Sequence, residues 1–173
     1  MIATFSDVFA LVVGTEGTAL SSDPSDPGNW ASGVVGQGQF IGSKFGISAA
    51  TFPGVDLVNL TYGMAQTLAK TRYWDPYQLD QLSPVTAYPI FDAAYNGFEH
   101  LTTTIQGIAG VAQDGVIGAQ TIAALRNLAP AKFALAFMAA HLNYWTSCAN
   151  WPADGKGWTR RGATVLANIF QNV

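Results

Sequence analysis

Acidic side chains gather in one short stretch near the amino terminus. It reads EGTALSSDPSDPGNWASG from Glu16 to Gly33 and contains Glu16, Asp23 and Asp26, in a chain of which only 11% of the residues are charged. Two Asp-Pro steps and a Pro-Gly step favour turns, so we expect a shaped loop here rather than a helix or a strand. Carboxylates in such a loop either form turns or do acid–base chemistry.

Glu16 is predicted to follow the buried face of a helix. Thr4 and Asp7 have the spacing of a helix start, and apolar residues follow at helical spacing: Phe5, Val8, Phe9, Val12 and Val13. Glu16 comes four residues after Val12, on or just past that face. Partial burial there would raise the carboxyl pKa, as a general acid near neutral pH requires. The alternative is a simple charge at a helix end.

Asp23 and Asp26 are expected in a different environment from Glu16. Held in a turn and exposed to water, both would stay ionised at neutral pH. Glycoside hydrolysis needs such a pair, because one carboxyl group protonates the leaving oxygen while the other stabilises positive charge or activates water. Spacing alone also fits two aspartates that only form turns.

Composition excludes several other classes of function. The net charge is −3 and only eight residues are Lys or Arg, so no nucleic-acid partner is expected. The one cysteine, Cys148, allows no intramolecular disulfide, and the two histidines, His100 and His141, lie far apart in the sequence. No dedicated zinc site and no histidine-based catalytic centre is therefore expected. We interpret Cys148 as a small buried apolar residue rather than a nucleophile.

The chain carries no recognisable targeting segment. The amino-terminal run MIATFSDVFALVVG lacks a basic region, and Ser6 and Asp7 interrupt its apolar residues. No stretch approaches the roughly 18 apolar residues of a membrane span. We expect synthesis in the cytoplasm without a signal peptide, and no integral membrane span.

The elements that must position these residues are mostly helices. Apart from the helix near Thr4, helices are expected from Thr61, from about Pro89, from Gly118 or Thr121, from Pro130, and through GKGWTRRGATVLANIF near the carboxyl terminus. Residues 17–46 are expected to form a loop or an irregular hairpin. With 49% apolar residues and 173 residues in all, the chain can bury the core of one compact domain.

Several motifs, in order along the chain, resemble those of glycoside hydrolase family 108, the N-acetylmuramidases of phage endolysins and secretion activators. EGTALSSDPSDPG followed by SKFGIS is similar to the family's glutamate, aspartate and glycine signature. Further matches are YWDPYQLDQL, IFDAAYNGF, GVAQDGVIGAQTIAAL and GWTRR. The resemblance spans residues 16–161. It implies cleavage of the β-1,4 bond between N-acetylmuramic acid and N-acetylglucosamine in peptidoglycan, with no cofactor.

The resemblance also implies roles for individual residues. Glu16 falls on the family's catalytic glutamate, Asp26 on its aspartate, and Ser43 on a threonine that precedes Gly46 by three residues. Asp23 is the alternative to Asp26. The segment NWASGVVGQGQF is an insertion relative to the family pattern and raises the question of whether it re-routes the loop between Asp26 and Ser43.

Three further residues are candidates for substrate binding. Trp30, inside the insertion, would either stack on a sugar or plug the loop. Tyr73 falls in the Tyr-Trp segment and is either a sugar platform or a core residue. Asn96 would bind an N-acetyl group or serve helix packing.

The implied fold is mostly α and lysozyme-like, with a small loop or β-hairpin lobe flanking an active-site groove. We expect a catalytic region over residues 1–100, with the lobe at about 17–50. Residues 101–173 are expected to form a helical, peptidoglycan-binding-like region of the same compact unit.

We expect a monomer that acts on bacterial peptidoglycan in the periplasm or cell wall after release, by a holin or a secretion system. The alternatives are a catalytically inactive wall-binding protein and a secreted antibacterial effector. Sequence does not decide between retention and inversion at the sugar, because that depends on the distance between the carboxyl groups.

Overall fold

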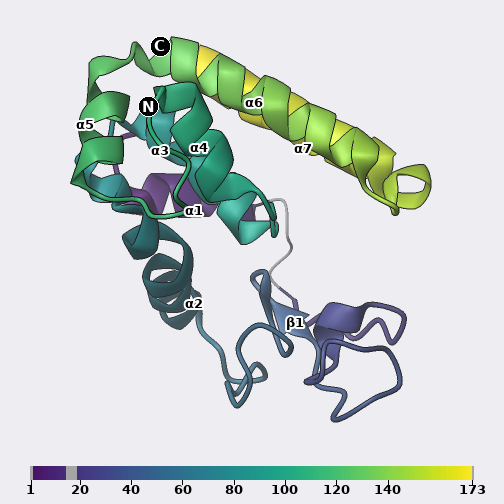
Figure 1. Ribbon diagram of the computed structural model, residues 1–173. Coiled ribbons are helices and arrows are strands. Elements are labelled where there is room, and N and C mark those ends of the chain that lie inside the picture. The colour runs from purple at the N-terminus through teal and green to yellow at the C-terminus, as the bar shows by residue number, and fades with distance from the viewer. Residues whose placement is uncertain (1, 15–18, 173) are drawn as a thin grey trace. The chain divides into compact units, whose positions relative to one another are not determined.

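The computed structural model describes residues 2–14 and 19–172. These fold mostly as α-helices, with one two-stranded sheet (Figure 1). The chain divides into two compact units: an amino-terminal unit, Ser6–Arg72, and a helical unit made of Met1–Phe5 with Tyr73–Val173. The predicted division of function near residue 100 stays a prediction.

Two helices frame the amino-terminal unit. Helix α1 (Phe5–Val13) begins where it was predicted and buries Val8, Phe9, Val12 and Val13. Helix α2 (Tyr62–Ala69) begins where it was predicted, because the Thr61 hydroxyl oxygen accepts the Met64 N–H at 3.3 Å. The ring centroids of Phe9 and Tyr62 lie 5.2 Å apart, so the two helices share an apolar contact.

A short antiparallel hairpin lies between these helices. Strands β1 (Ser43–Lys44) and β2 (Ile47–Ser48) pair with Ser43 opposite Ser48 and Lys44 opposite Ile47. The connecting residues Phe45 and Gly46 both have positive φ, 53° and 71°, as a tight two-residue hairpin turn requires.

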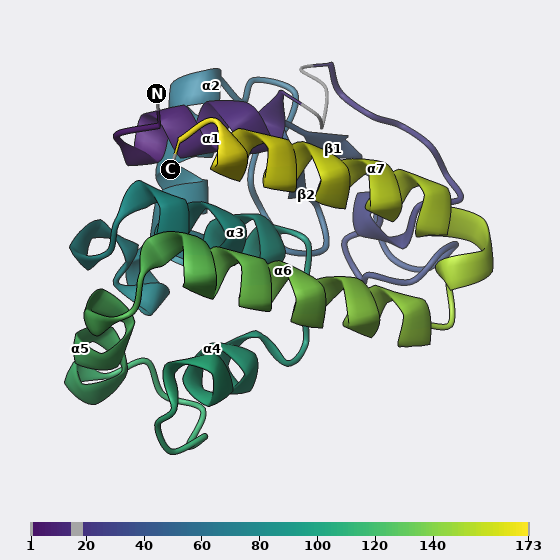
Figure 2. The ribbon, with the colours of Figure 1, turned by 90° about the horizontal axis from the view of Figure 1, so that it is seen from above.

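Five α-helices make up most of the helical unit as far as the structure describes it. These are α3 (Pro84–Tyr95), α4 (Leu101–Ala109), α5 (Ala119–Asn127), α6 (Pro130–Ser147) and α7 (Trp151–Phe170). Helix α6 packs against α3, α4 and α7, and α6 and α7 run side by side along their length (Figure 2). The two ends of the chain meet in this unit, where the Ile2 N–H donates to Asn172 Oδ1 at 2.6 Å.

Some helix boundaries differ from the prediction. Helix α3 starts at Pro84 rather than near Pro89, because the Ser83 hydroxyl accepts the Thr86 N–H at 3.2 Å and Pro84 occupies the first turn. Of the two starts proposed for α5, Gly118 is correct, and Thr121 is buried inside the helix. Helix α7 begins at Trp151, before GKGWTRR, and α4 was not predicted.

No single helix in the described ranges has the length and apolar character to cross a membrane. Helices α5 and α6 meet those criteria only when taken together, and they are bent by 112°.

Candidate functional site

Asp26 is held by the turn that it begins. It precedes a 3-10 turn, Pro27–Asn29, and its Oδ1 accepts the Gly28 N–H at 2.8 Å. The side chain is exposed, and its second oxygen has no hydrogen-bond partner among the described residues. One carboxylate oxygen is therefore fixed by backbone while the other is open to a ligand or to water.

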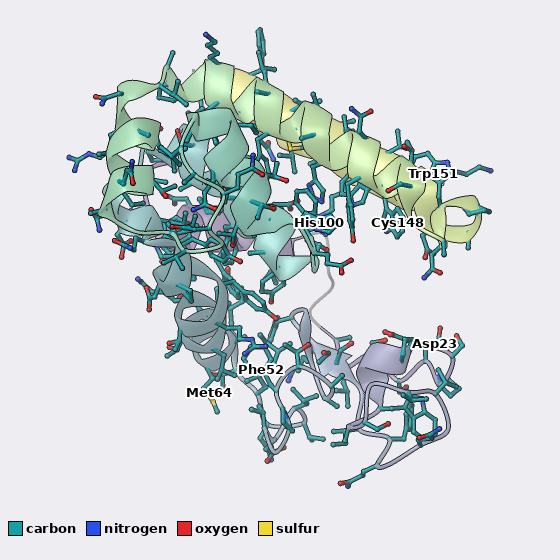
Figure 3. All side chains as sticks on the ribbon, viewed as in Figure 1. Asp23, Phe52, Met64, His100, Cys148 and Trp151 are labelled. Atoms are coloured by element: carbon teal, nitrogen blue, oxygen red, sulfur yellow. The ribbon has the colours of Figure 1, made fainter. Side chains whose placement is uncertain are left out.

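Asp23 is held more firmly and by another residue. Its Oδ1 accepts both the Ser25 N–H, at 2.8 Å, and the Ser25 hydroxyl, at 2.7 Å. The Ser25 hydroxyl and N–H lower the pKa of this exposed carboxyl, so it is ionised at neutral pH. Figure 3 labels Asp23 in the loop beside the Pro27–Asn29 turn.

The two ends of the insertion are joined by backbone hydrogen bonds, and whether the insertion re-routes the chain relative to the family pattern stays an open question. The backbone oxygen of buried Asn29 accepts the N–H groups of Ile41, at 2.9 Å, and Gly42, at 3.1 Å. The Asn29 side chain also donates to the Asp23 backbone oxygen at 2.9 Å. The first and last residues of the insertion therefore lie close together, and Ile41 lies next to the segment that contains Gly28. The turn that carries Asp26 and the strand that carries Ser43 are therefore connected by the hydrogen bonds between the two ends of the insertion.

Trp30 is tied into the loop itself. Its indole N–H donates to the Pro24 backbone oxygen at 3.0 Å, and its ring centroid lies 5.1 Å from that of Phe40. Trp30 and Phe40 also form an isolated antiparallel bridge. These contacts hold the loop together, and contact with a sugar stays a prediction.

Ser43 sits at the start of β1, half-buried. Its backbone N–H and oxygen pair with those of Ser21, at 3.1 and 2.7 Å, which attaches the loop that leads to Asp23 to the sheet. Its hydroxyl makes no hydrogen bond to any residue in the described ranges. Its predicted role in orienting water or an aspartate stays a prediction. Glu16, the predicted acid, lies outside the described residues.

Tyr73 and Asn96 belong to the helical unit. The Tyr73 ring packs edge-on against Tyr95, with centroids 5.0 Å apart. Asn96 follows α3, is exposed, and donates its Nδ2–H to the Asp92 backbone oxygen at 2.7 Å. The Tyr73 ring thus packs against the end of α3, and the Asn96 side chain binds the backbone at the same end, while substrate contact stays a prediction for each.

A buried ion pair lies beneath Asn96. The Arg161 Nη2 donates to Asp92 Oδ1 at 2.8 Å, and its Nε lies 3.0 and 3.2 Å from the two carboxylate oxygens. Asp92 is 2% exposed. The motif GWTRR contains Arg161 but does not show its partner, and Asp92 was not among the predicted site residues. The sequence does hold a signal for Asp92: it is the one acidic residue in the apolar run IFDAAY, and a buried acid needs a buried partner.

A pocket of about 580 Å³ opens beside this ion pair. It lies between the end of α3 and the turn that joins α6 to α7. His100 and Cys148, labelled in Figure 3, both line it. Within the described ranges no group of three His, Cys, Asp or Glu side chains is arranged to hold a metal ion.

Comparison with known proteins identifies the family. A family model described as glycosyl hydrolase 108 matches residues 9–97, just over half of the chain. The chain belongs to the glycosyl hydrolase 108 family. The matched range includes each predicted site residue from Glu16 to Asn96, and the resemblance seen in the sequence motifs is confirmed.

A solved structure extends the family likeness beyond the matched range. The structure of Brucella abortus SagA is 26% identical, with a TM-score of 0.79, covering 96% of this chain and 94% of that one. No curated protein matches the sequence. The mostly α, lysozyme-like fold is thereby confirmed. As a family 108 member the protein is a glycoside hydrolase of the peptidoglycan-hydrolase type.

Proposed function

We propose that this family 108 hydrolase is a muramidase that cleaves the β-1,4 bond between N-acetylmuramic acid and N-acetylglucosamine. The observation that carries the proposal is the attachment of the Asp26 turn. One Asp26 oxygen is fixed by the Gly28 N–H, and the insertion closes on the backbone oxygen of Asn29, the last residue of the same turn. The family match supports the reaction class.

Glu16 and Asp26 divide the chemistry between them. Glu16 donates a proton to the glycosidic oxygen as the bond to the sugar breaks. The open oxygen of Asp26 stabilises the positive charge that develops on the ring, or positions the attacking water. Asp26 suits this task better than Asp23. One oxygen of Asp23 already accepts two hydrogen bonds from Ser25, and these bonds stabilise its ionised form and lower its pKa.

The proposal is tested on purified peptidoglycan with three matched variants. Turbidity and new reducing ends are measured for wild type, Glu16→Gln, Asp26→Asn and Asp23→Asn. We expect Glu16→Gln to lose about 10² to 10⁴ in rate, the usual contribution of a general acid. Asp26→Asn should also be strongly impaired, while Asp23→Asn stays close to wild type.

Other outcomes would each revise the assignment. Strong loss in Asp23→Asn with an active Asp26→Asn would transfer the second role to Asp23. Reducing ends on N-acetylglucosamine instead of muramic acid would overturn the bond specificity. A wild-type protein that sediments with the wall but releases nothing at any pH would be a wall-binding protein.

The proposed substrate also sets the place of action. Peptidoglycan lies outside the cytoplasmic membrane, so we propose that the protein works as a monomer in the periplasm or cell wall. Release by a holin would make it an endolysin, and export by a secretion system would make it an effector. Lysis timing after holin induction distinguishes them, because an effector needs no holin to reach the wall.

A further inference from the structure

Charge is distributed unevenly between the last two helices and the rest of the chain. Helices α6 and α7 contain four of the eight Lys and Arg residues of the sequence, but only one of its eleven Asp and Glu residues. One of these four cations, Arg161, is paired with buried Asp92, and three remain. The chain as a whole has a net charge of −3. Two helices of an acidic protein are therefore positively charged, which favours an anionic partner for them.

The outward sides of α6 and α7 form one surface. Both helices pack against α3, and Figure 2 shows them side by side over it. We infer that this surface binds the anionic surface of a phospholipid membrane. We call it the α6–α7 face, and the residues that carry the inference are Lys132, Leu135, Lys156, Arg160 and Phe170, all of them exposed. The inference goes beyond the proposed function and does not depend on it.

Three cations supply the attraction. Lys132, Lys156 and Arg160 have no ion-pair partner among the residues that the structure describes. Asp154, the one acid of the two helices, comes two residues before Lys156, so the two side chains point to nearly opposite sides of α7. Each Lys or Arg close to an anionic membrane strengthens binding about fivefold.

Two apolar side chains project from the same helices. Phe170 is 80% exposed and Leu135 is 59% exposed. A short turn joins α6 to α7, so Leu135, near the start of α6, and Phe170, at the end of α7, lie at the same end of the helix pair. Exposed positions between this end and the turn include four alanines, which leave room for a flat partner: Ala136, Ala139, Ala163 and Ala167.

The apolar residues favour a membrane over a hydrated polyanion. A nucleic acid or another charged polymer would contact the cations and leave Phe170 and Leu135 in water. A membrane accepts both, because apolar side chains enter the boundary between headgroups and acyl chains while Lys and Arg stay at the level of the phosphates. The α6–α7 face has this combination of side chains.

The end of the face near the α6–α7 turn contains a hollow that suits a lipid headgroup. Its volume is about 500 Å³, and Trp151, Lys156 and Arg160 are among the residues that line it. The Trp151 ring, labelled in Figure 3, is folded against α7, since a Cβ on Gly155 would lie 2.8 Å from it. Tryptophan is enriched at the headgroup level of membranes, and the two cations beside it can bind a phosphate.

Cosedimentation of the full-length protein with vesicles tests the inference. Vesicles of phosphatidylcholine with about 30% phosphatidylglycerol are compared with vesicles of phosphatidylcholine alone, and we expect at least about tenfold tighter binding to the anionic ones. That advantage should shrink as the salt concentration rises. Equal binding to the two kinds of vesicle would overturn the inference.

A first pair of variants locates the charge that matters. The double variant Lys156→Gln/Arg160→Gln should bind anionic vesicles at least about tenfold more weakly than wild type. The control Arg72→Gln/Arg126→Gln removes the same charge from exposed positions outside the α6–α7 face, and its affinity should change by less than about twofold. Equal weakening by both would overturn the inference, because net charge alone would then explain binding.

A second pair of variants tests the apolar contact. Phe170→Ser should weaken binding to anionic vesicles at least about threefold, because the ring is partly removed from water at the membrane. The control is Val58→Ser, which changes a residue of the amino-terminal unit that is 65% exposed and should leave binding unchanged. Equal affinity in the two serine variants would overturn membrane binding in favour of a polyanion held by charge alone.

Vesicle binding and wall cleavage can each fail without the other. Glu16→Gln, the variant expected to lose cleavage, should bind anionic vesicles like wild type. A protein that binds these vesicles but cleaves no glycan would overturn the proposed function alone. A protein that cleaves purified peptidoglycan but does not bind the vesicles would overturn the present inference alone.

Discussion

His141 is a buried imidazole whose protonation should affect the stability of the protein at low pH. It is 1% exposed, lies 4.5 Å from the Phe98 ring and 4.2 Å from the Trp145 ring by centroid, and neither ring nitrogen has a described partner. Burial, with a smaller contribution from the Arg161 charge, lowers the pKa of His141 to about 4. The folded protein therefore holds this side chain neutral where the unfolded chain, with an ordinary pKa of about 6.5, binds a proton.

We expect this residue to destabilise the protein as the pH falls. Above pH 6.5 the residue is neutral in both the folded and the unfolded state and costs no stability. As the pH drops from about 6.5 towards about 4, the unfolded chain binds a proton first, and the unfolding free energy falls by about 3 kcal/mol in total. Thermal unfolding of wild type and His141→Leu between pH 4.5 and 7 measures it. The variant should show the shallower pH dependence, and parallel curves would contradict the assignment.

At Gly42 the backbone of Ser21 comes so close that a side chain would not fit. Its φ is +108°, and a Cβ there would collide with the backbone oxygen of Ser21, which pairs with Ser43. Gly42→Ala should therefore lower the unfolding free energy by more than about 1 kcal/mol and reduce wall cleavage, because it pushes the loop that carries Asp23 off the sheet. Gly36, at φ +77° with no atom within 4 Å of its Cβ position, is the control. Equal effects on cleavage by the two alanines would contradict the role given to the Ser21 contact.

At the scale of elements, close contact between α6 and α7 depends on one glycine. A Cβ on Gly162 would lie 2.9 Å from Leu142 Cδ2 and 3.1 Å from the Trp145 ring, whereas Gly157 in the same helix faces open space. We expect Gly162→Ala to destabilise the protein and Gly157→Ala to stabilise it by about 0.5–1 kcal/mol through helix propensity. Denaturant unfolding of both variants checks the opposite signs. Stabilisation by both would mean that α6 and α7 are not tightly packed at Gly162.

The insertion is a self-contained element. Residues 31–39 lie between Trp30 and Phe40, which already pair as an antiparallel bridge. Replacing residues 31–39 with Asn-Gly should therefore preserve the fold, with a change in unfolding free energy of less than about 1 kcal/mol, since shortening a loop changes closure entropy little. Wall cleavage by the shortened protein should match wild type. A large loss of cleavage with intact folding would show that the insertion contacts the substrate.

At the scale of the molecule, the Asp92–Arg161 pair joins segments 69 residues apart in sequence. It links α3 to α7 across the helical unit and lies almost fully out of water. Asp92→Asn leaves a buried guanidinium without its counter-charge, so we expect a loss of about 3–5 kcal/mol. Arg160→Ala, at the exposed neighbouring position, should change stability by less than about 0.5 kcal/mol. Unfolding by urea at pH 7 measures both, and comparable effects would refute the importance of the pair.

Local chemistry in the sequence was enough to predict several features. Thr61 and Pro130 mark helix starts because a cap or a proline acts on its own first turn. The turn at Asp23–Gly28 follows from Asp-Pro and Pro-Gly steps for the same reason. The candidate acids and the family rest on motifs that are contiguous in the chain. Such features need no knowledge of what lies across the fold.

Tertiary structure decided everything that depends on partners distant in sequence. The spacing of GWTRR does not reveal that Arg161 is directed inward to Asp92, nor does NWASGVVGQGQF reveal that its ends close on Asn29. The pocket around Asn96 and Asn150 and the burial of His141 depend on how α3, α6 and α7 pack. These contacts arise from burial and packing between elements, which the order of residues along one element does not encode.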